Sequence, residues 1–97
     1  MPPRYAVNIA DLARLEEIPR LCLMAPVVQS RTTIRAEPGM IDGAAIVLEC
    51  PERQAAAICD LVRDLDVRAK RYETRCYIEG KRGGWHRMKR RERILKR

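Results

Sequence analysis

The clearest pattern of hydrophobic and polar positions is an apolar stripe with helical spacing between residues 51 and 66. Residues three or four positions apart lie on the same face of a helix. Pro51 suits the first helical turn, where its missing N–H has no intrahelical partner, and the Glu52 carboxylate suits the helix dipole. We therefore expect the main helix at about residues 51–66. Its apolar stripe comprises Ala55, Ile58, Cys59, Val62 and Leu65.

Two stretches before this helix have the pattern of strands. Residues 31–36 alternate, with Ile34 on one side and Arg35 on the other, which is typical of a half-buried strand. Residues 44–50 are apolar on both faces, which is typical of an interior strand. Two turn signals, Pro-Gly and Asp-Gly, separate the stretches. We expect the two strands to form a hairpin.

Residues 71–79 alternate again and predict a further strand. Cys76 and Ile78 lie on its apolar face, whereas Arg75 and Tyr77 lie on the opposite face. The glycine-rich stretch that follows, GKRGG, predicts a loop or a hairpin turn.

The N-terminal third allows two interpretations. Residues 5–9 alternate like a short strand, or Asn8 caps a helix there instead. The spacing of the next apolar residues predicts a short helix to about Glu17, because Pro19 ends or bends a helix. The apolar run of residues 21–28 is expected to be buried as a strand or an irregular segment.

These elements predict an α+β domain in which one main helix packs on a small antiparallel sheet. If the first strand forms, the order is β-α-β-β-α-β, the ferredoxin-like arrangement. A plainer α+β sheet with one main helix is the alternative. We expect residues 1–84 to form this single domain and residues 85–97 to follow it as a basic C-terminal tail or helix.

The composition fits one globular domain of 97 residues, since 46% of them are hydrophobic and 34% are charged. No apolar run reaches the roughly 20 residues that a membrane-spanning helix needs. The N-terminus lacks the charged start and apolar run of a secretory signal. We therefore expect a cytoplasmic protein without a membrane partner.

The four cysteines are widely spaced and form no CxxC pair. We expect them to be buried thiols, with a disulfide or a metal site as the alternatives. No phosphate-binding or dinucleotide-binding motif occurs in the sequence. We expect no cofactor and no metal. The cysteines are Cys22, Cys50, Cys59 and Cys76.

The net charge of +7 is concentrated in the last third of the chain. Residues 1–66 contain seven arginines and ten acidic residues, whereas residues 67–97 contain thirteen basic residues and three glutamates. The excess of positive charge in the last third is larger than solubility requires, and the mutual repulsion of these charges would destabilise the fold. It indicates an anionic partner for the last third.

Nucleic acid fits this partner best, because lysine and arginine contact phosphates and release their counterions. Tyr77 or Trp85 could stack on an unpaired base, although Trp85 could instead cap the core. We therefore expect a small, non-enzymatic protein that binds RNA or DNA. The candidate contact residues are Arg71, Arg75, Tyr77, Lys81, Arg82, Trp85, His86, Arg87, Lys89, Arg90, Arg91 and Arg93.

The stretch Gly80-Lys81-Arg82-Gly83 resembles the GxxG loop with which KH domains clamp a nucleic-acid backbone. The resemblance covers four residues and implies backbone contacts at this loop. In KH domains the loop joins two helices, whereas here a strand is expected before it.

Two other hypotheses use the same end of the chain. In the first, the basic end docks on an acidic protein surface, as in a regulatory module such as a phage or plasmid inhibitor or accessory factor, and the sheet pairs in a homodimer. In the second, His86 is the general base of a small ribonuclease, with Tyr77 as a second acid–base group. Phosphate would then be held by Arg82, Arg87 or Lys89.

Overall fold

The computed structural model describes residues 3–29, 31–41, 43–68 and 74–88. It is an α+β fold with one antiparallel five-stranded sheet and two helices packed on it. The strand order is β2-β3-β1-β4-β5, and its first four strands have an order compatible with the ferredoxin-like arrangement. The elements are β1 (Arg4–Asn8), a 3-10 turn (Leu12–Arg14), α1 (Glu17–Met24), β2 (Thr33–Pro38), β3 (Ala44–Glu49), α2 (Glu52–Leu65), β4 (Cys76–Glu79) and β5 (Trp85–Arg87).

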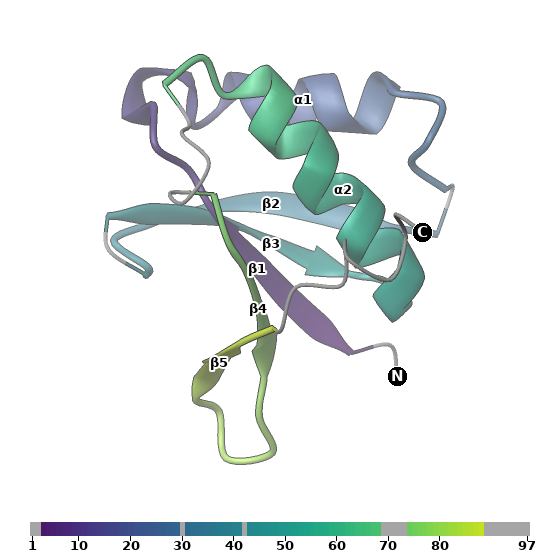
Figure 1. The fold of residues 1–97 in the computed structure, drawn as a ribbon, viewed down its shortest axis with the longest axis vertical. Coiled ribbons are helices and arrows are strands. Elements are labelled where there is room, and N and C mark those ends of the chain that lie inside the picture. Colours follow the sequence, from purple (N-terminus) through teal and green to yellow (C-terminus); the bar gives the residue numbers. More distant parts are fainter. Residues whose placement is uncertain (1–2, 30, 42, 69–73, 89–97) are drawn as a thin grey trace, which may run out of the picture.

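Both helices lie on the same face of the sheet (Figure 1). The core forms between this face and the helices. β1 and β3 contribute alternate residues to it, and the helices contribute their apolar stripes. Burying each large aliphatic side chain contributes roughly 1.5–3 kcal/mol. The largest aliphatic members of the core are Val7, Ile18, Ile46, Leu48, Ile58 and Val62.

Three sequence predictions in the middle of the chain are confirmed. The main helix runs from Glu52 to Leu65, with the predicted stripe turned to the core. β3 is buried on both faces, as its apolar pattern indicates. β2 pairs with β3 in an antiparallel hairpin and turns Ile34 to the core.

The N-terminal third corrects the sequence prediction. Its first strand is confirmed as β1, but the helix expected to end at about Glu17 begins there instead. Pro19 lies in the first turn of α1, where the backbone N–H groups have no intrahelical acceptor, so its ring breaks no hydrogen bond. The prediction for 21–28 is wrong in its first half, where Leu21–Met24 complete α1 and Met24 is 79% exposed; residues 25–28 are irregular as expected, but only Cys22 of the segment is buried.

The C-terminal part of the described chain also differs from the sequence prediction. β4 is confirmed from Cys76 onward, and residues 71–73 lie outside the described residues. A helix beginning at Trp85 is wrong, since Trp85–Arg87 form β5 against β4. The turn before β5 reverses the chain and lets it pair with the free edge of β4. Residues 89–97, which make up most of the predicted basic tail, lie outside the described residues.

Two buried polar side chains fasten α2 to the segments around it. The Asp66 carboxylate accepts hydrogen bonds from the N–H groups of Ala10 and Asp11 at 2.6 and 3.0 Å. The Gln54 amide donates to the carbonyl of Val27 at 2.7 Å. Because buried polar groups are costly without partners, these bonds fix the loops at both ends of the helical layer.

The cysteines are free thiols, and three of the four are buried as the sequence predicts. Burial raises the pKa of the Cys22 and Cys50 thiols to about 11. A hydrogen bond with Cys59, together with burial, raises the pKa of the half-buried Cys76. Within the described ranges, no group of three or more potential ligands has the geometry of a metal site.

Across the part of the chain that the structure describes, no helix has the length and apolar character needed to span a bilayer.

Candidate nucleic-acid interface

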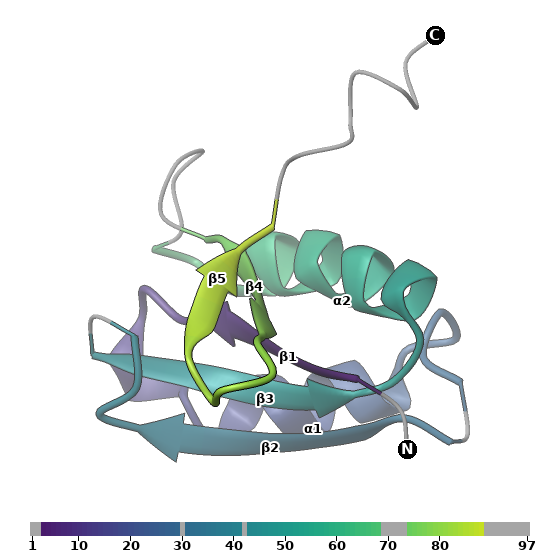
Figure 2. The ribbon, with the colours of Figure 1, turned by 90° about the horizontal axis from the view of Figure 1, so that it is seen from below.

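The face of the sheet opposite α1 and α2 is here called the helix-free face, because no helix of the described residues packs on it. Figure 2 shows the sheet from this side, with α1 behind β2 and β3. The strand register aligns one residue from each strand in a row across this face. This central row runs from β2 to β5 through Arg35, Val47, Ala6, Tyr77 and Arg87.

Arg4 lies in a second row beside the central one, together with Glu49, Glu79 and Trp85. Its Nη1 donates to both carboxylate oxygens of Glu79, at 3.1 and 3.2 Å, and its Nε lies 3.9 Å from Glu49. Its guanidinium carbon lies 5.8 Å from the centroid of the Trp85 ring, within range of a cation–π contact. The charge of Arg4 is therefore matched by two carboxylates.

The position of Trp85 follows from this row. Trp85 is half-buried and lies opposite Glu79, outside the apolar core between the sheet and the helices. It does not cap the core. The contact with Arg4 joins Trp85 on β5 to β1.

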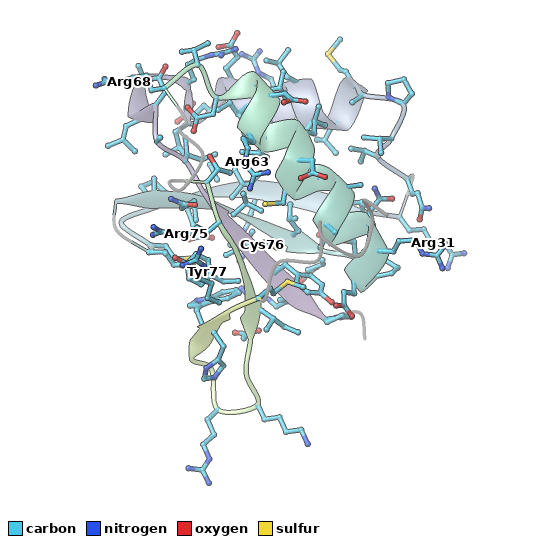
Figure 3. The ribbon with its side chains drawn as sticks, in the orientation of Figure 1. Arg31, Arg63, Arg68, Arg75, Cys76 and Tyr77 are labelled. Carbon is cyan, nitrogen blue, oxygen red and sulfur yellow. The ribbon has the colours of Figure 1, made fainter. Side chains whose placement is uncertain are left out.

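Tyr77 is the other aromatic residue of the helix-free face. Its partners across the sheet are Ala6 on β1 and Arg87 on β5. Figure 3 shows Tyr77 and Arg75 projecting to the same side of β4, whereas Arg63 lies beside α2. The prediction that Arg75 and Tyr77 lie on the same outward side is confirmed, although Arg75 directly precedes β4.

Among the described residues, Arg35 of the β2–β3 half of this face is ion-paired, whereas several cations of the β4–β5 half are not. On the β2–β3 half, Arg35 Nε lies 2.7 Å from a Glu37 carboxylate oxygen, and the Thr33 hydroxyl donates to Glu49 at 3.1 Å. On the β4–β5 half, several cations make no ion pair with any carboxylate of the described residues. These cations are Arg75, Lys81, Arg82 and Arg87, of which all but Arg75 are exposed.

Lys81 and Arg82 occupy the tip of the β4–β5 hairpin. The Gly83 N–H donates to the Gly80 carbonyl at 3.0 Å, so the two basic residues are the central pair of a tight turn. Gly83 has a φ of +88°, in the left-handed region that favours glycine. In Figure 1 the hairpin extends from the sheet away from both helices. The turn presents both side chains beyond the edge of the domain.

This geometry does not support the resemblance to KH domains. The loop of residues 80–84 joins two antiparallel strands, whereas the KH loop joins two helices. The four-residue match is therefore a glycine-flanked hairpin turn with two basic residues at its centre.

His86 lies on the other side of its strand. It pairs with Ile78, whereas Arg87 pairs with Tyr77, so His86 and Tyr77 project from opposite faces of the sheet. The imidazole rests against the turn: a Cβ added to Gly80 would lie 2.7 Å from His86 Nε2. The structure does not bring together the acid–base pair that the ribonuclease hypothesis needs.

The structure thus groups some of the predicted contact residues and separates others. Arg75, Tyr77, Trp85 and Arg87 share the helix-free face, Lys81 and Arg82 extend from its edge, and His86 faces away. The remaining predicted residues, Arg71, Lys89, Arg90, Arg91 and Arg93, lie outside the described residues.

Sequence reasoning missed two arginines that belong to this face. Arg35 was correctly placed on the outward side of its strand, but its position in one row with Tyr77 depends on the order of five strands. Arg4 precedes the alternating residues of β1 and gave no local signal of its contacts with Glu79 and Trp85. Only the strand order brings these residues together.

Comparisons with known proteins add no relative to this description: no protein-family model, no curated protein and no solved structure matches the chain.

Proposed function

We propose that the protein binds nucleic acid without catalysing a reaction on it, and that the β4–β5 half of the helix-free face is part of its contact surface. The observation that carries the proposal is that four cations of the β4–β5 half have no carboxylate partner among the described residues: Arg75 and Arg87 flank the outward-facing Tyr77, and Lys81 and Arg82 lie at the tip of the hairpin. The basic residues after Met88 would supply further phosphate contacts.

The charge distribution favours an external anion as the partner of these cations. A partly exposed ion pair contributes only about 0–1 kcal/mol to stability, so unpaired surface cations cost the fold little. Towards a polyanion the same cations act together, since each neutralised phosphate releases counterions into solution. Binding should therefore fall steeply as the salt concentration rises.

The first experiment is a titration of the whole chain with labelled single-stranded RNA, single-stranded DNA and duplex DNA at low and near-physiological salt. The test variant replaces Arg75, Lys81, Arg82 and Arg87 with glutamine. A matched control replaces four exposed arginines outside this half: Arg20 on α1, Arg53 on α2, and Arg31 and Arg68 in connecting segments. Figure 3 shows Arg31 and Arg68 at sites distant from Tyr77.

Both variants lose the same net charge, so they separate a local surface from a general charge effect. We expect the test variant to lose most of its affinity near physiological salt and the control to lose far less. Equal losses would contradict the location of the site. No binding by the unmodified chain at either salt concentration would contradict nucleic-acid binding itself and favour the hypothesis of an acidic protein partner.

The basic end of the chain needs a separate variant. A chain that ends at Met88 keeps β5, whereas a chain that ends at Gly84 would lose this strand and Trp85. We expect the chain ending at Met88 to bind more weakly than the full chain but still above the four-residue test variant. Reversing the charges of Arg90 and Arg91 in the full chain should weaken binding to every sequence by about the same factor.

A further inference from the structure

We propose that this surface takes single-stranded nucleic acid, with one base stacked on the ring of Tyr77. The inference rests on the proposed function and adds the class of nucleic acid and the residue that selects it.

The burial of two small residues indicates how the Tyr77 ring lies. Ala6 and Val47 are only 0% and 1% exposed, although they face the helix-free side of the sheet. Among the described residues, Tyr77 is the direct partner of Ala6 across β1 and β4. A tyrosine that stands upright would leave the alanine open to water, so we infer that the ring lies along the sheet and turns one face outward.

The outward ring face has cations on two sides. Arg87 is opposite Tyr77 on β5, where Cβ atoms of paired residues lie about 5 Å apart. Arg75 lies two residues before Tyr77 on the same side of the chain, about 7 Å away. A nucleotide places a flat base between flanking phosphates, so one stacked base would bring its phosphates towards both arginines.

This arrangement favours a single strand over a duplex. Inside a duplex each base is stacked on its neighbours, and a protein surface can reach only the backbone and the base edges. In a single strand, a base that stacks on an aromatic side chain contributes about 1–3 kcal/mol to binding. Tyr77 is the aromatic residue that lies beside Arg75 and Arg87, whereas Trp85 lies beside the ion pair of Arg4 and Glu79.

The experiment compares the effect of Tyr77 on strands that differ only in their bases. Three probes of about 12 nucleotides are titrated near physiological salt: a mixed-sequence single strand, an abasic strand with the same phosphates, and the corresponding duplex. RNA and DNA versions of the base-bearing single strand are used in parallel. The proteins are the full unmodified chain and its Tyr77→Leu and Tyr77→Phe variants.

We expect Tyr77→Leu to weaken binding to the base-bearing single strand by about 5- to 150-fold, which is the stacking contribution expressed as a ratio. Binding to the abasic strand and to the duplex should change by less than about twofold. Tyr77→Phe should bind like the unmodified chain, because the ring is retained. If the Tyr77 hydroxyl contacts RNA specifically, Tyr77→Phe will lower the affinity for the RNA strand and leave the affinity for the DNA strand unchanged.

The outcomes separate this inference from the proposed function. If the four-cation variant loses binding while Tyr77→Leu binds the single strand normally, the inference is overturned and the proposed function stands. If no probe binds the unmodified chain, both fail. Should Tyr77→Leu not fold, the unmodified chain still decides, since equal affinity for the base-bearing and abasic strands would exclude stacking.

Discussion

On the β2–β3 half of the helix-free face, Arg35 is paired with Glu37 at 2.7 Å, whereas on the β4–β5 half Arg87 meets no carboxylate of the described residues. Both arginines lie in the same row, at opposite ends of the sheet. The same face therefore neutralises some of its cations within the fold, Arg35 with Glu37 and Arg4 with Glu79. The difference supports the proposal that the β4–β5 half contacts an external anion.

The largest effect is expected from neutralising the four cations of the β4–β5 half. Replacing Arg75, Lys81, Arg82 and Arg87 with glutamine removes about four phosphate contacts, so the slope of log affinity against log salt should become shallower by about 3. Near physiological salt this corresponds to a loss of affinity of about 100- to 1,000-fold. Titrations at four or more salt concentrations give the slope directly.

The free energy of unfolding of this variant should stay within about 0.5 kcal/mol of the unmodified value, because Lys81, Arg82 and Arg87 are exposed and the Nε of the half-buried Arg75 has no hydrogen bond to lose. Urea denaturation measures it. A large loss of stability would mean that these cations serve the fold, and the contrast between the two halves would disappear.

Raising the pH weakens the fold that both halves share. The thiols of Cys22 and Cys50 ionise at about pH 11 in the folded protein and near their ordinary pKa of about 9 when unfolded. Their contribution is fully present below pH 9 and is lost as the pH rises towards 11, by an amount on the order of 2 kcal/mol for each thiol.

Urea denaturation at pH 8, 9, 10 and 11 tests this expectation. Cys22→Ala and Cys50→Ala variants serve as controls, because each should flatten the decline above pH 9. A free energy of unfolding that is constant up to pH 11 would show that these thiols are not held in an apolar environment. Binding measurements on the two halves belong below pH 9, where the fold is unaffected.

Arg4→Met should affect stability rather than binding, because Arg4 is the charged residue that joins the two halves. The variant loses two hydrogen bonds to Glu79 and the contact with Trp85, and we expect a loss of about 1–2 kcal/mol in the free energy of unfolding. The fluorescence of Trp85, the only tryptophan, follows the unfolding. Arg4→Lys keeps the charge and should recover part of the loss; an unchanged Arg4→Met would contradict this role.

The smallest expected effect comes from making the paired half resemble the unpaired one. Glu37→Gln releases Arg35 from its ion pair, and one further phosphate contact would raise affinity by up to about fourfold near physiological salt. Glu16→Gln, which removes the same charge from an exposed position before α1, is the control. Equal gains in the two variants would show that net charge alone decides.

The local parts of this structure could be predicted from the sequence, and the long-range parts could not. The main helix and the outward face shared by Arg75 and Tyr77 follow from periodicity, because each depends on residues within one element. α1 was misplaced because the disruption expected from Pro19 does not occur in a first helical turn. β5 was missed because a strand of three residues is too short for periodicity to reveal.

The candidate site shows the same limit. The sequence supplied its cations and its tyrosine, but not which of them share a surface. His86 follows Trp85 directly in the chain and was grouped with it, although the strand register places the two side chains on opposite faces. The contact between Arg4 and Glu79 depends on strand order, which no local pattern of the sequence specifies.

The central position of β1 has a consequence for the order in which the protein is made. β1 pairs with β3 and β4, and its contact from Arg4 to Glu79 spans 75 positions of the chain. At the usual rate of synthesis of about 5–20 residues per second, the part of β4 that pairs with β1 is made about 4 to 15 seconds after β1. During this time a strand with buried residues on both faces lacks one neighbour. β4 and β5 are made after β1, β2 and β3, so a growing chain acquires the first three strands of its sheet before it acquires the surface proposed to bind nucleic acid.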